Sequence, residues 1–498
     1  MTETIAPIVE DIPLDKHSEE PIYQQLIRHF QLQIASGRLE QGTRLPPSRD
    51  LARQLKIGRI SVVSAYNELQ AKGLISAHPG RGTFVSGPNG SHKSMPQQSQ
   101  TINRAVPHHN MREVLQLAEK PGVISFLSGT PPEEFLPLDA FRWAIDTVLN
   151  RDGASAVTYE DAEGYMPLRE ATRDYVTSQG INCRAEDILI TGGAQQALDL
   201  VIQSILSPGD ILLTANPTYL GVLDIAHVRR AVPMGVPVDE DGIRLDALED
   251  ILLEHRPRLL YINPTFSNPT GTVMSIHRRR QLLRLAYEYK LMILEDAVYH
   301  ELHFETPPPV PLKALDEYGC VFYTNGYSKI LLPGTRIGYL IASDNSSRER
   351  ILQVKQAADI CTPAFNQRVV HTYIQHGKLP GHLDRIRHIL RDRRDAALEA
   401  LDKFLPMVTY CQEPKGGLYL WVELPEDGPT AAELYMTAIE HGVSYAMGTL
   451  FHVNGEGARH MRLNFAVQKP ENIREGFRRL RAAWDAFRTD DIERKPIL

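Results

Sequence analysis

Residues 321–338 read VFYTNGYSKILLPGTRIG, an apolar stretch that leads into polar and basic side chains. The first four residues, Val321–Thr324, are typical of a buried strand, because β-branched and aromatic side chains favour the pleated backbone. Ser328 and Lys329 follow shortly after this stretch, and Arg336 stands seven residues beyond the lysine. The segment therefore predicts a strand whose end presents a hydroxyl, an amine and a guanidinium.

Apolar stretches of the same kind recur along the chain, and amphipathic segments of helical length separate them. Strands that alternate with helices favour a mainly parallel sheet with helices on both faces. The sequence thus predicts an α/β fold for the part of the chain that follows residue 112. The expected strands are Asp187–Ile190, Ile211–Thr214, Leu259–Ile262, Met292–Leu294 and Val321–Thr324.

The overall composition is that of a folded, water-soluble protein. Of 498 residues, 42% are hydrophobic and 23% are charged, which excludes a wholly disordered or fibrous chain. The four cysteines form no CxxC pair, so neither a disulfide framework nor a thiolate zinc site is indicated. No apolar run reaches the ~18 residues that cross a bilayer, and the first twenty residues are too acidic for a signal peptide. We expect a cytoplasmic protein that has no membrane segment.

The net charge of −7 conceals a division along the chain. Residues 21–85 contain nine basic residues against three acidic ones, whereas residues 1–20 contain six acidic residues against one lysine. A small basic module is therefore attached to a large acidic one. Such asymmetry is expected of a module that meets a polyanion, although a merely solvated basic surface would look the same.

A polar stretch separates the two modules. Residues 86–112 contain no aromatic residue and are rich in Ser, Gln, Asn, Pro and Gly, so they cannot bury enough apolar surface to fold. We interpret them as a flexible linker. The predicted organisation is an acidic extension over residues 1–20, a first domain over 21–85, the linker over 86–112 and a large domain over 113–498.

The first domain has the pattern of a helix-turn-helix followed by a β-hairpin. Apolar residues recur at helical spacing over residues 22–36, and a short helix is expected from Ser48, its predicted cap, to about Leu55. A third helix is expected over residues 59–72, with Val62, Tyr66 and Leu69 facing inward. Residues 74–85 then predict a hairpin with a Gly- and Arg-bearing tip.

These residues resemble the GntR family of winged helix-turn-helix repressors. The similar motifs are LPPSRDLARQL (45–55), RISVVSAYNEL (59–69), KGLI (72–75) and GRGTFV (80–85). The resemblance implies contacts with double-stranded promoter DNA, from Arg49, Arg59 and the wing residue Arg81, with Ser61 and Ser64 facing the groove. Arg49 could instead pair with a neighbouring acid, and Arg81 could merely keep the turn soluble.

One departure from that family is Gly58, where a capping Ser or Asn is usual before the recognition helix. Glycine costs only a few tenths of a kcal/mol relative to a good cap, so we expect the helix to form.

In the large domain, further polar residues follow predicted strands. Asp296 ends the apolar stretch that begins at Met292, and Asn268 opens an NPTG turn after the strand 259–262. Ala194 and Gln195 lie where a strand meets a helix, so their amide groups and the helix dipole can receive a phosphate. Tyr219 ends a second NPT segment and supplies an aromatic ring. Each signal alone is common in ordinary turns.

Together and in this order, the segments resemble the fold-type I aminotransferase family over some 380 residues. The resemblance implies pyridoxal 5'-phosphate as cofactor, held by Lys329 as an internal aldimine. Asp296 would pair with the pyridinium nitrogen, Asn268 and Tyr299 would hydrogen-bond the ring oxygen, and Tyr219 would stack on the ring. The phosphate would be held by Ala194, Gln195, Ser328 and Arg336. Tyr219 could also be an ordinary core residue.

The family's carboxylate-binding arginine matches Arg462, in RHMRLNF (459–465), with Arg459 as the nearby competitor. The chain departs from the family pattern at Gly326, where a Ser or Thr usually reaches the phosphate. That hydroxyl is missing unless Thr324 or water replaces it. Tyr159 resembles a tyrosine that reaches the partner subunit's cofactor in family dimers, or else it packs before a turn.

The combination of both modules resembles the MocR/GabR group of bacterial transcriptional regulators. That resemblance implies a homodimer that senses an amine, an amino acid or pyridoxal phosphate itself and changes its binding to a promoter. The alternative is a working aminotransferase with an accessory DNA-binding head. A repressor whose pocket has decayed is disfavoured, because Asn268, Asp296, Lys329 and Arg336 are all present.

Overall fold

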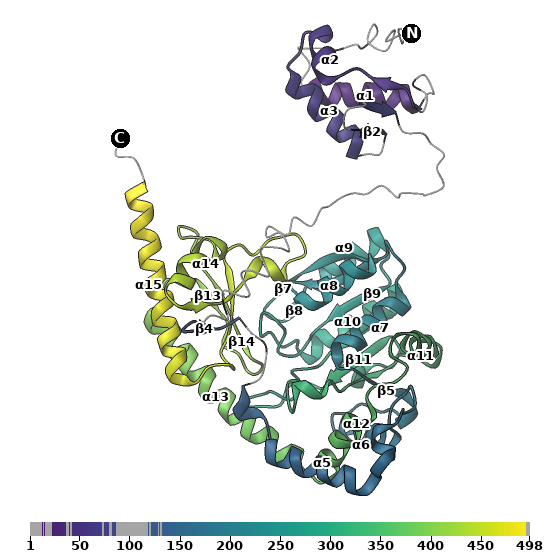
Figure 1. Cartoon of the computed structure of the whole chain (residues 1–498), viewed down its shortest axis with the longest axis vertical. Helices are drawn as coiled ribbons and strands as arrows, with labels where there is room; N and C mark the ends of the chain where they lie inside the picture. Colours follow the sequence, from purple (N-terminus) through teal and green to yellow (C-terminus); the bar gives the residue numbers. More distant parts are fainter. Residues whose placement is uncertain are drawn as a thin grey trace. The chain divides into compact units, whose positions relative to one another are not determined.

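The computed structural model describes residues 12, 14, 22–35, 39, 42–71, 74–78, 82–85, 118, 121–127, 129 and 132–494. The chain divides into two compact units, Met1–Thr101 and Ile102–Leu498, which we describe separately (Figure 1). Among the described residues, no helix combines the length and the apolar character that a bilayer crossing requires. The predicted boundaries near residues 20 and 86, and the linker itself, lie outside the described residues.

The first unit is a winged helix-turn-helix, as predicted. Its strands form a small antiparallel sheet in the order β1-β3-β2, and Leu26, Phe30, Val62 and Leu69 are fully buried between the helices. The Tyr66 hydroxyl donates a hydrogen bond to the Pro46 carbonyl at 2.8 Å, which fixes the start of the second helix. The elements are α1 (Ile22–Ala35), β1 (Arg44–Leu45), α2 (Ser48–Leu55), α3 (Arg59–Ala71), β2 (Ile75–His78) and β3 (Gly82–Val85).

The predicted cap of α2 is wrong. Ser48 is the first helical residue, the residue before the helix is Pro47, and no side chain caps the helix. The Pro47 carbonyl accepts hydrogen bonds from the amides of Asp50 and Leu51 at 2.9 and 3.0 Å, so the rigid proline sets the helix start instead. At Gly58 a side chain would meet open space, and its carbonyl accepts the Ser61 amide at 3.1 Å, so α3 forms without the usual cap.

The second unit is built on an eight-stranded, mainly parallel sheet, which confirms the predicted α/β fold (Figure 1). Strand β12 runs antiparallel to both of its neighbours, and β8 runs antiparallel to β7. The order is β5 (Ile188–Thr191), β12 (Gly338–Ile341), β11 (Val321–Gly326), β10 (Met292–Asp296), β9 (Leu259–Ile262), β6 (Ile211–Asn216), β7 (Val232–Asp239) and β8 (Gly242–Ile243). All five predicted strands are present, whereas β7, β8 and β12 were not expected.

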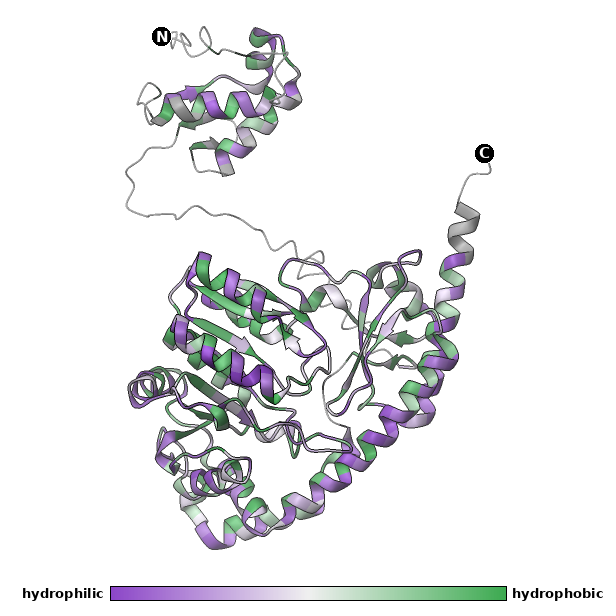
Figure 2. Cartoon of the chain, turned by 180° about the vertical axis from the view of Figure 1, so that it is seen from behind, coloured by the Kyte–Doolittle hydropathy of each residue, from purple (hydrophilic) through white to green (hydrophobic). Residues whose placement is uncertain are grey.

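Helices cover both faces of this sheet. Alternate strand residues enter two separate apolar clusters, which explains the nearly continuous apolar runs in the sequence. Leu212, Leu294 and Phe322 face α7 (Ala194–Ile205), α8 (Leu220–Arg229) and α11 (Asn345–Asp359), whereas Leu213, Ile293 and Val321 face α9 (Leu245–His255) and α10 (Ile276–Tyr289). Figure 2 shows the same division, with hydrophobic strands between helices that carry hydrophilic residues.

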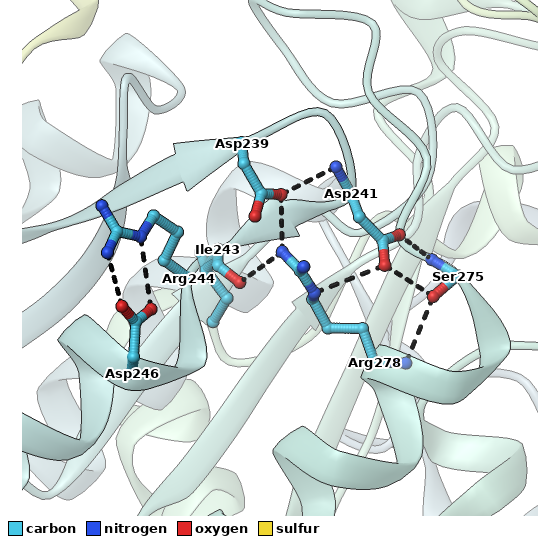
Figure 3. Close-up of polar contacts among 7 residues, drawn as sticks. All are labelled: Asp239, Asp241, Ile243, Arg244, Asp246, Ser275 and Arg278. Carbon is cyan, nitrogen blue, oxygen red and sulfur yellow. Dashed lines mark hydrogen bonds and ion pairs between the residues drawn. The ribbon is translucent and has the colours of Figure 1, made fainter.

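A polar network attaches the β7–β8 hairpin to the start of α10 (Figure 3). The Ser275 hydroxyl caps α10 by accepting the Arg278 amide at 3.2 Å, and the same hydroxyl donates to Asp241 at 2.7 Å. The Arg278 guanidinium pairs with Asp239 at 2.5 Å and Asp241 at 3.3 Å. Arg244 pairs with Asp246 beside it. These contacts hold the edge of the sheet in place.

A smaller antiparallel sheet completes the large unit, in the order β13 (Tyr410–Cys411), β14 (Tyr419–Glu423), β17 (His460–Asn464) and β16 (Ala446–Met447). Two short strands, β4 (Ile124–Ser125) and β15 (Val443–Ser444), pair beside it. The remaining helices are α5 (Leu138–Asp152), α6 (Met166–Thr177), α12 (Ala364–Gln375), α13 (Lys378–Phe404), α14 (Ala431–Glu440) and α15 (Pro470–Arg494).

Candidate functional site

A cavity of about 610 Å³ lies between the large sheet and the smaller one. Asp296 ends β10, Lys329 follows β11, and Arg462 reaches the cavity from β17 of the smaller sheet. The structure brings together all ten residues predicted for the cofactor and effector site: Ala194, Gln195, Tyr219, Asn268, Asp296, Tyr299, Ser328, Lys329, Arg336 and Arg462. A larger hollow of about 1090 Å³ beside α6 and α13 contains none of them.

The Asp296 carboxyl is buried at the centre of this site. It accepts hydrogen bonds from the Tyr261 hydroxyl at 2.9 Å and from the Val298 amide at 3.4 Å. Burial raises the pKa of Asp296 to about 6, although these hydrogen bonds and the charge of Lys329 act in the opposite direction. A buried carboxylate of this kind is stabilised by a cationic or N–H partner in the cavity.

One end of the cavity is built to hold an anion. No side chain caps the start of α7, where Ala194 and Gln195 line the cavity. Arg336 lies across this helix end and donates to the Ser328 hydroxyl and the Gly192 carbonyl, both at 3.2 Å. Gly193 has a φ of +90°, a backbone conformation that favours glycine, and a β-carbon there would also come within 2.6 Å of the Arg336 guanidinium. Helix dipole and guanidinium together favour a phosphate.

Arg462 lies between two aromatic rings, over Tyr419 at 4.3 Å and Phe451 at 4.7 Å from the ring centres. It donates to the Asn268 side-chain carbonyl and to the Leu127 carbonyl, both at 2.9 Å, while its buried Nε has no hydrogen-bond partner. The competing Arg459 donates to two carbonyls, Pro425 at 2.6 Å and Gly428 at 2.9 Å, and does not line the cavity.

Two tyrosines line the cavity with this arginine, and the charge of Lys329 acts on one of them, Tyr419. The hydroxyls of Tyr299 and Tyr419 lie 3.2 Å apart, and Asn268 donates to Tyr299 at 3.3 Å. Burial raises the pKa of Tyr299 well above its usual value. Burial also raises the pKa of Tyr419, but the charges of Arg462 and Lys329 outweigh it and leave that pKa below its usual range. Tyr419 therefore donates its proton more readily than an ordinary tyrosine.

The sequence left open whether Tyr219 belongs to the site and whether Thr324 replaces the hydroxyl missing at Gly326. Tyr219 lines the cavity and donates to the Gln195 side chain at 3.1 Å, and burial raises its pKa to about 12. Thr324 is fully buried and donates to the Tyr339 carbonyl at 3.0 Å. The Thr324 hydroxyl therefore donates its hydrogen bond inside the sheet and does not line the cavity. The alternative that Thr324 replaces the hydroxyl missing at Gly326 is wrong.

Sequence reasoning missed several residues of this site. Asn263 directly follows β9 and donates to the Asp296 carbonyl at 2.8 Å, so the rule that selected Asp296 could have found it. Tyr261 lies within a predicted strand, where a phenol among apolar residues was a usable signal. Tyr419 and Gly129 had no local signal, because distant parts of the chain bring them to the cavity.

Four of the five predicted DNA-contacting residues lie on described helices: Arg49 on α2, and Arg59, Ser61 and Ser64 on α3. Arg49, Arg59 and Ser64 are exposed, and Ser61 is half-buried. Asp50 is the acidic residue next to Arg49. Its carboxylate forms an ion pair with Arg53 at 3.6 Å. Arg81 lies outside the described residues.

Two family profiles match the chain. The profile of aminotransferase class I and II matches residues 122–480, and that of bacterial regulatory proteins of the gntR family matches residues 22–85. Known proteins resemble either the large unit alone or nearly the whole chain.

The 2-aminoadipate transaminase of Thermus thermophilus is 37% identical over 74% of this chain and 92% of its own length. The uncharacterized HTH-type transcriptional regulator YdfD of Bacillus subtilis is 31% identical over 93% of this chain and 96% of its own length. Among solved structures, the multiple substrate aminotransferase of Thermococcus profundus superposes with a TM-score of 0.73 at 35% identity, over 77% of this chain and 96% of that one.

Replacing Asp296 by Asn tests the buried charge. The folded chain holds the Asp296 proton up to about pH 6, whereas the unfolded chain releases it near 3.8, so stability falls as pH rises through this window. The shift corresponds to about 3 kcal/mol. Without added ligand, we expect D296N to be more stable than the wild type above pH 6, by up to that amount, and similar to it near pH 4.

The measurement is urea denaturation of the large unit from pH 4 to 8. Asp139→Asn is the control, because that carboxylate is fully exposed. A D296N chain that is no more stable than the wild type at pH 8 would refute the assignment of a destabilising buried charge.

Proposed function

Since the chain belongs to the aminotransferase class I and II family and carries a gntR-type head, we propose that it is a transcriptional regulator whose promoter binding responds to an amine. The amine is an amino acid or a related effector, or the signal is the cofactor itself. Aminotransferases of this fold depend on pyridoxal phosphate. The observation that carries the proposal is the cavity, because all ten residues predicted for the cofactor and the effector line it.

The proposal keeps the predicted division into an extension (1–20), a DNA-binding domain (21–85), a linker (86–112) and an effector domain (113–498). In the first domain, Arg49, Arg59 and Arg81 contact DNA, and Ser61 and Ser64 face the groove. Such a regulator acts on the chromosome and therefore in the cytoplasm.

The cavity residues fit pyridoxal phosphate. Lys329 offers the amine, the Asp296 carboxyl offers the buried partner that a ring nitrogen requires, and Arg336 with the start of α7 offers the anion site. Gly193 leaves room for the Arg336 guanidinium beside the start of α7, which agrees with this fit. When bound, the cofactor supplies an aldehyde that condenses reversibly with amines and a ring that withdraws electrons.

The residues of the cavity orient the cofactor and the effector and supply protons. Tyr219 covers the cavity beside Gln195, and Asn268 and Tyr299 donate or accept at the ring oxygen. Tyr419 lies beside Tyr299 with a lowered pKa, so it is the tyrosine of this pair that gives up a proton more readily. The aromatic faces around Arg462 exclude water and hold the guanidinium flat for a bidentate acid group. An amino acid or sulfonate is therefore favoured over a simple amine.

A second candidate function is transamination, because the Thermus thermophilus transaminase is 37% identical over 74% of this chain and 92% of its own length. The two functions differ in turnover. A regulator binds its effector and stops or turns over slowly, whereas an enzyme completes cycles when a 2-oxo acid is present.

The test of the main proposal uses DNA from the chain's own promoter region. We expect pyridoxal phosphate together with amino acids to change the affinity of the full chain for this DNA by about 5- to 150-fold, the usual size of a coupling free energy. K329A keeps the DNA affinity but loses the response. Lys290→Ala is the control, because that lysine is exposed on the surface, and it keeps both the DNA affinity and the response to the effector. An equal response of wild type and K329A would refute the proposal.

The hydroxyl missing at Gly326 gives a second prediction. A β-carbon there would lie 3.4 Å from the Ile337 carbonyl and 3.5 Å from the Ala194 amide. These are ordinary van der Waals distances, so the position has room for a serine side chain. G326S should bind pyridoxal phosphate more tightly than the wild type, by about two- to tenfold for one added hydrogen bond. Titration followed by cofactor absorbance measures this, with G326A as the control for the added carbon. Equal affinity of the two variants would contradict the prediction.

We also propose that the chain is a homodimer. Large exposed apolar side chains cluster in the sequence over α5, η2 (Gly153–Val157) and the residues just beyond them, and we take this segment as the surface that a partner covers. Tyr159 is 83% exposed, so the alternative that it packs within its own chain is wrong. The cluster comprises Leu138, Trp143, Leu149, Val157, Tyr159 and Met166.

Charge insertion tests this dimer. Val157 is 68% exposed within the cluster, and Val228 on α8 is 73% exposed outside it. Sedimentation should show a dimer for the wild type and for V228R, and a larger fraction of monomer for V157R. A monomeric wild type, or the same behaviour of both variants, would exclude this surface as the interface.

A further inference from the structure

Residues 121–127 and Gly129, near the start of the large unit, form a strap that follows the predicted linker in the sequence. Its outer half is attached to the smaller sheet. Ile124 and Phe126 donate their amides to the carbonyls of Gly442 and Ser444, both at 2.9 Å. Arg479 of α15 donates to the carbonyls of Gly122 and Gly442, both at 2.8 Å.

The inner half of the strap contacts the two cations of the cavity. The Leu127 carbonyl accepts a hydrogen bond from Arg462 at 2.9 Å, and the Gly129 carbonyl accepts one from the amine of Lys329 at 2.7 Å. These are the two groups that the proposed function assigns to the effector's acid group and to the cofactor. The strap carbonyls and the ligands therefore compete for the same two donors, the Arg462 guanidinium and the Lys329 amine.

Competition for these donors follows from their geometry. An amine of Lys329 that is engaged by a ligand has fewer N–H groups to donate, so its contact with Gly129 weakens. An acid group on Arg462 competes with the neutral carbonyl of Leu127, and charge-assisted hydrogen bonds are the stronger ones. Each ligand thus removes one inner contact and leaves the strap held only by its outer contacts, to Gly442, Ser444 and Arg479, which open more readily once the inner half is free.

We propose that this strap transmits occupancy of the cavity to the DNA-binding head, by docking on Lys329 and Arg462 and being released when ligands engage them. The inference rests on the proposed function, because it takes the roles of these two residues from it. Release frees residues 121–127, which come after the end of the predicted linker in the sequence. By reciprocity, whatever loosens the strap also strengthens ligand binding.

The first experiment follows hydrogen exchange of the strap amides in the full chain. The probes are pyridoxal phosphate, which engages Lys329, and N-(5'-phosphopyridoxyl)-L-leucine, which adds a carboxylate. We expect the amides of residues 124–127 to exchange faster with each probe, and faster with the leucine compound than with pyridoxamine phosphate, which lacks the carboxylate. Unchanged or slower exchange would overturn the inference.

The second experiment uses Arg479, which stabilises the docked strap and does not line the cavity. R479Q should loosen the strap, so that without ligand it binds promoter DNA as the ligand-bound wild type does. It should also bind the leucine compound more tightly, whereas a merely structural defect would weaken binding. R478Q is the control, because Arg478 pairs with Glu475 at 2.7 Å, as Arg479 does at 2.9 Å, and no contact joins Arg478 to the strap.

The outcomes separate this inference from the proposed function. If the wild type takes up no cofactor or shows no DNA response, the proposed function fails and the inference falls with it. If the wild type responds while R479Q matches R478Q in DNA binding and ligand affinity, the inference alone fails.

Discussion

The parallel pairing of β9, β10 and β11 is the constraint on which the site depends. In this register Glu295 lies beside Ile262, and Asp296 lies beside Thr324, so the carboxyl ends of the three strands meet at one edge. The polar residues that follow them are therefore brought together although they are far apart in the sequence. The apolar clusters on both faces hold this register, because a slip by one residue would exchange the two buried faces.

Electrostatics then divides the cavity into regions. Arg336 and the start of α7 make one end positive, the buried Asp296 makes the centre acidic, and Arg462 makes the far wall positive. A ligand with a phosphate, a basic ring nitrogen and a carboxylate would satisfy all three regions. The same cations also hold main-chain carbonyls of the strap, so binding chemistry and chain conformation are coupled through shared donors.

The sequence allowed much of this to be predicted, and the failures have physical causes. Apolar runs revealed the central strands. Strand β12 (GYLI) has the same kind of run and was overlooked, whereas β8 has only two residues and is too short to show a pattern. Site residues at strand ends, such as Asp296 and Lys329, follow from a local rule. Tyr419 comes from the smaller sheet and reaches the cavity only through tertiary packing, which no spacing reveals. The cap assigned to Ser48 failed because the preceding proline starts the helix one residue earlier than expected.

The central claim is that the amine of Lys329 reacts with the cofactor. Its most direct test is to mix the full chain with pyridoxal phosphate, reduce the mixture with borohydride and map the label by peptide mass spectrometry. The account predicts a phosphopyridoxyl group on the peptide that contains Lys329 and none on the buried Lys355. A chain that remains unlabelled, or a label spread over exposed lysines with Lys329 unmodified, would contradict it.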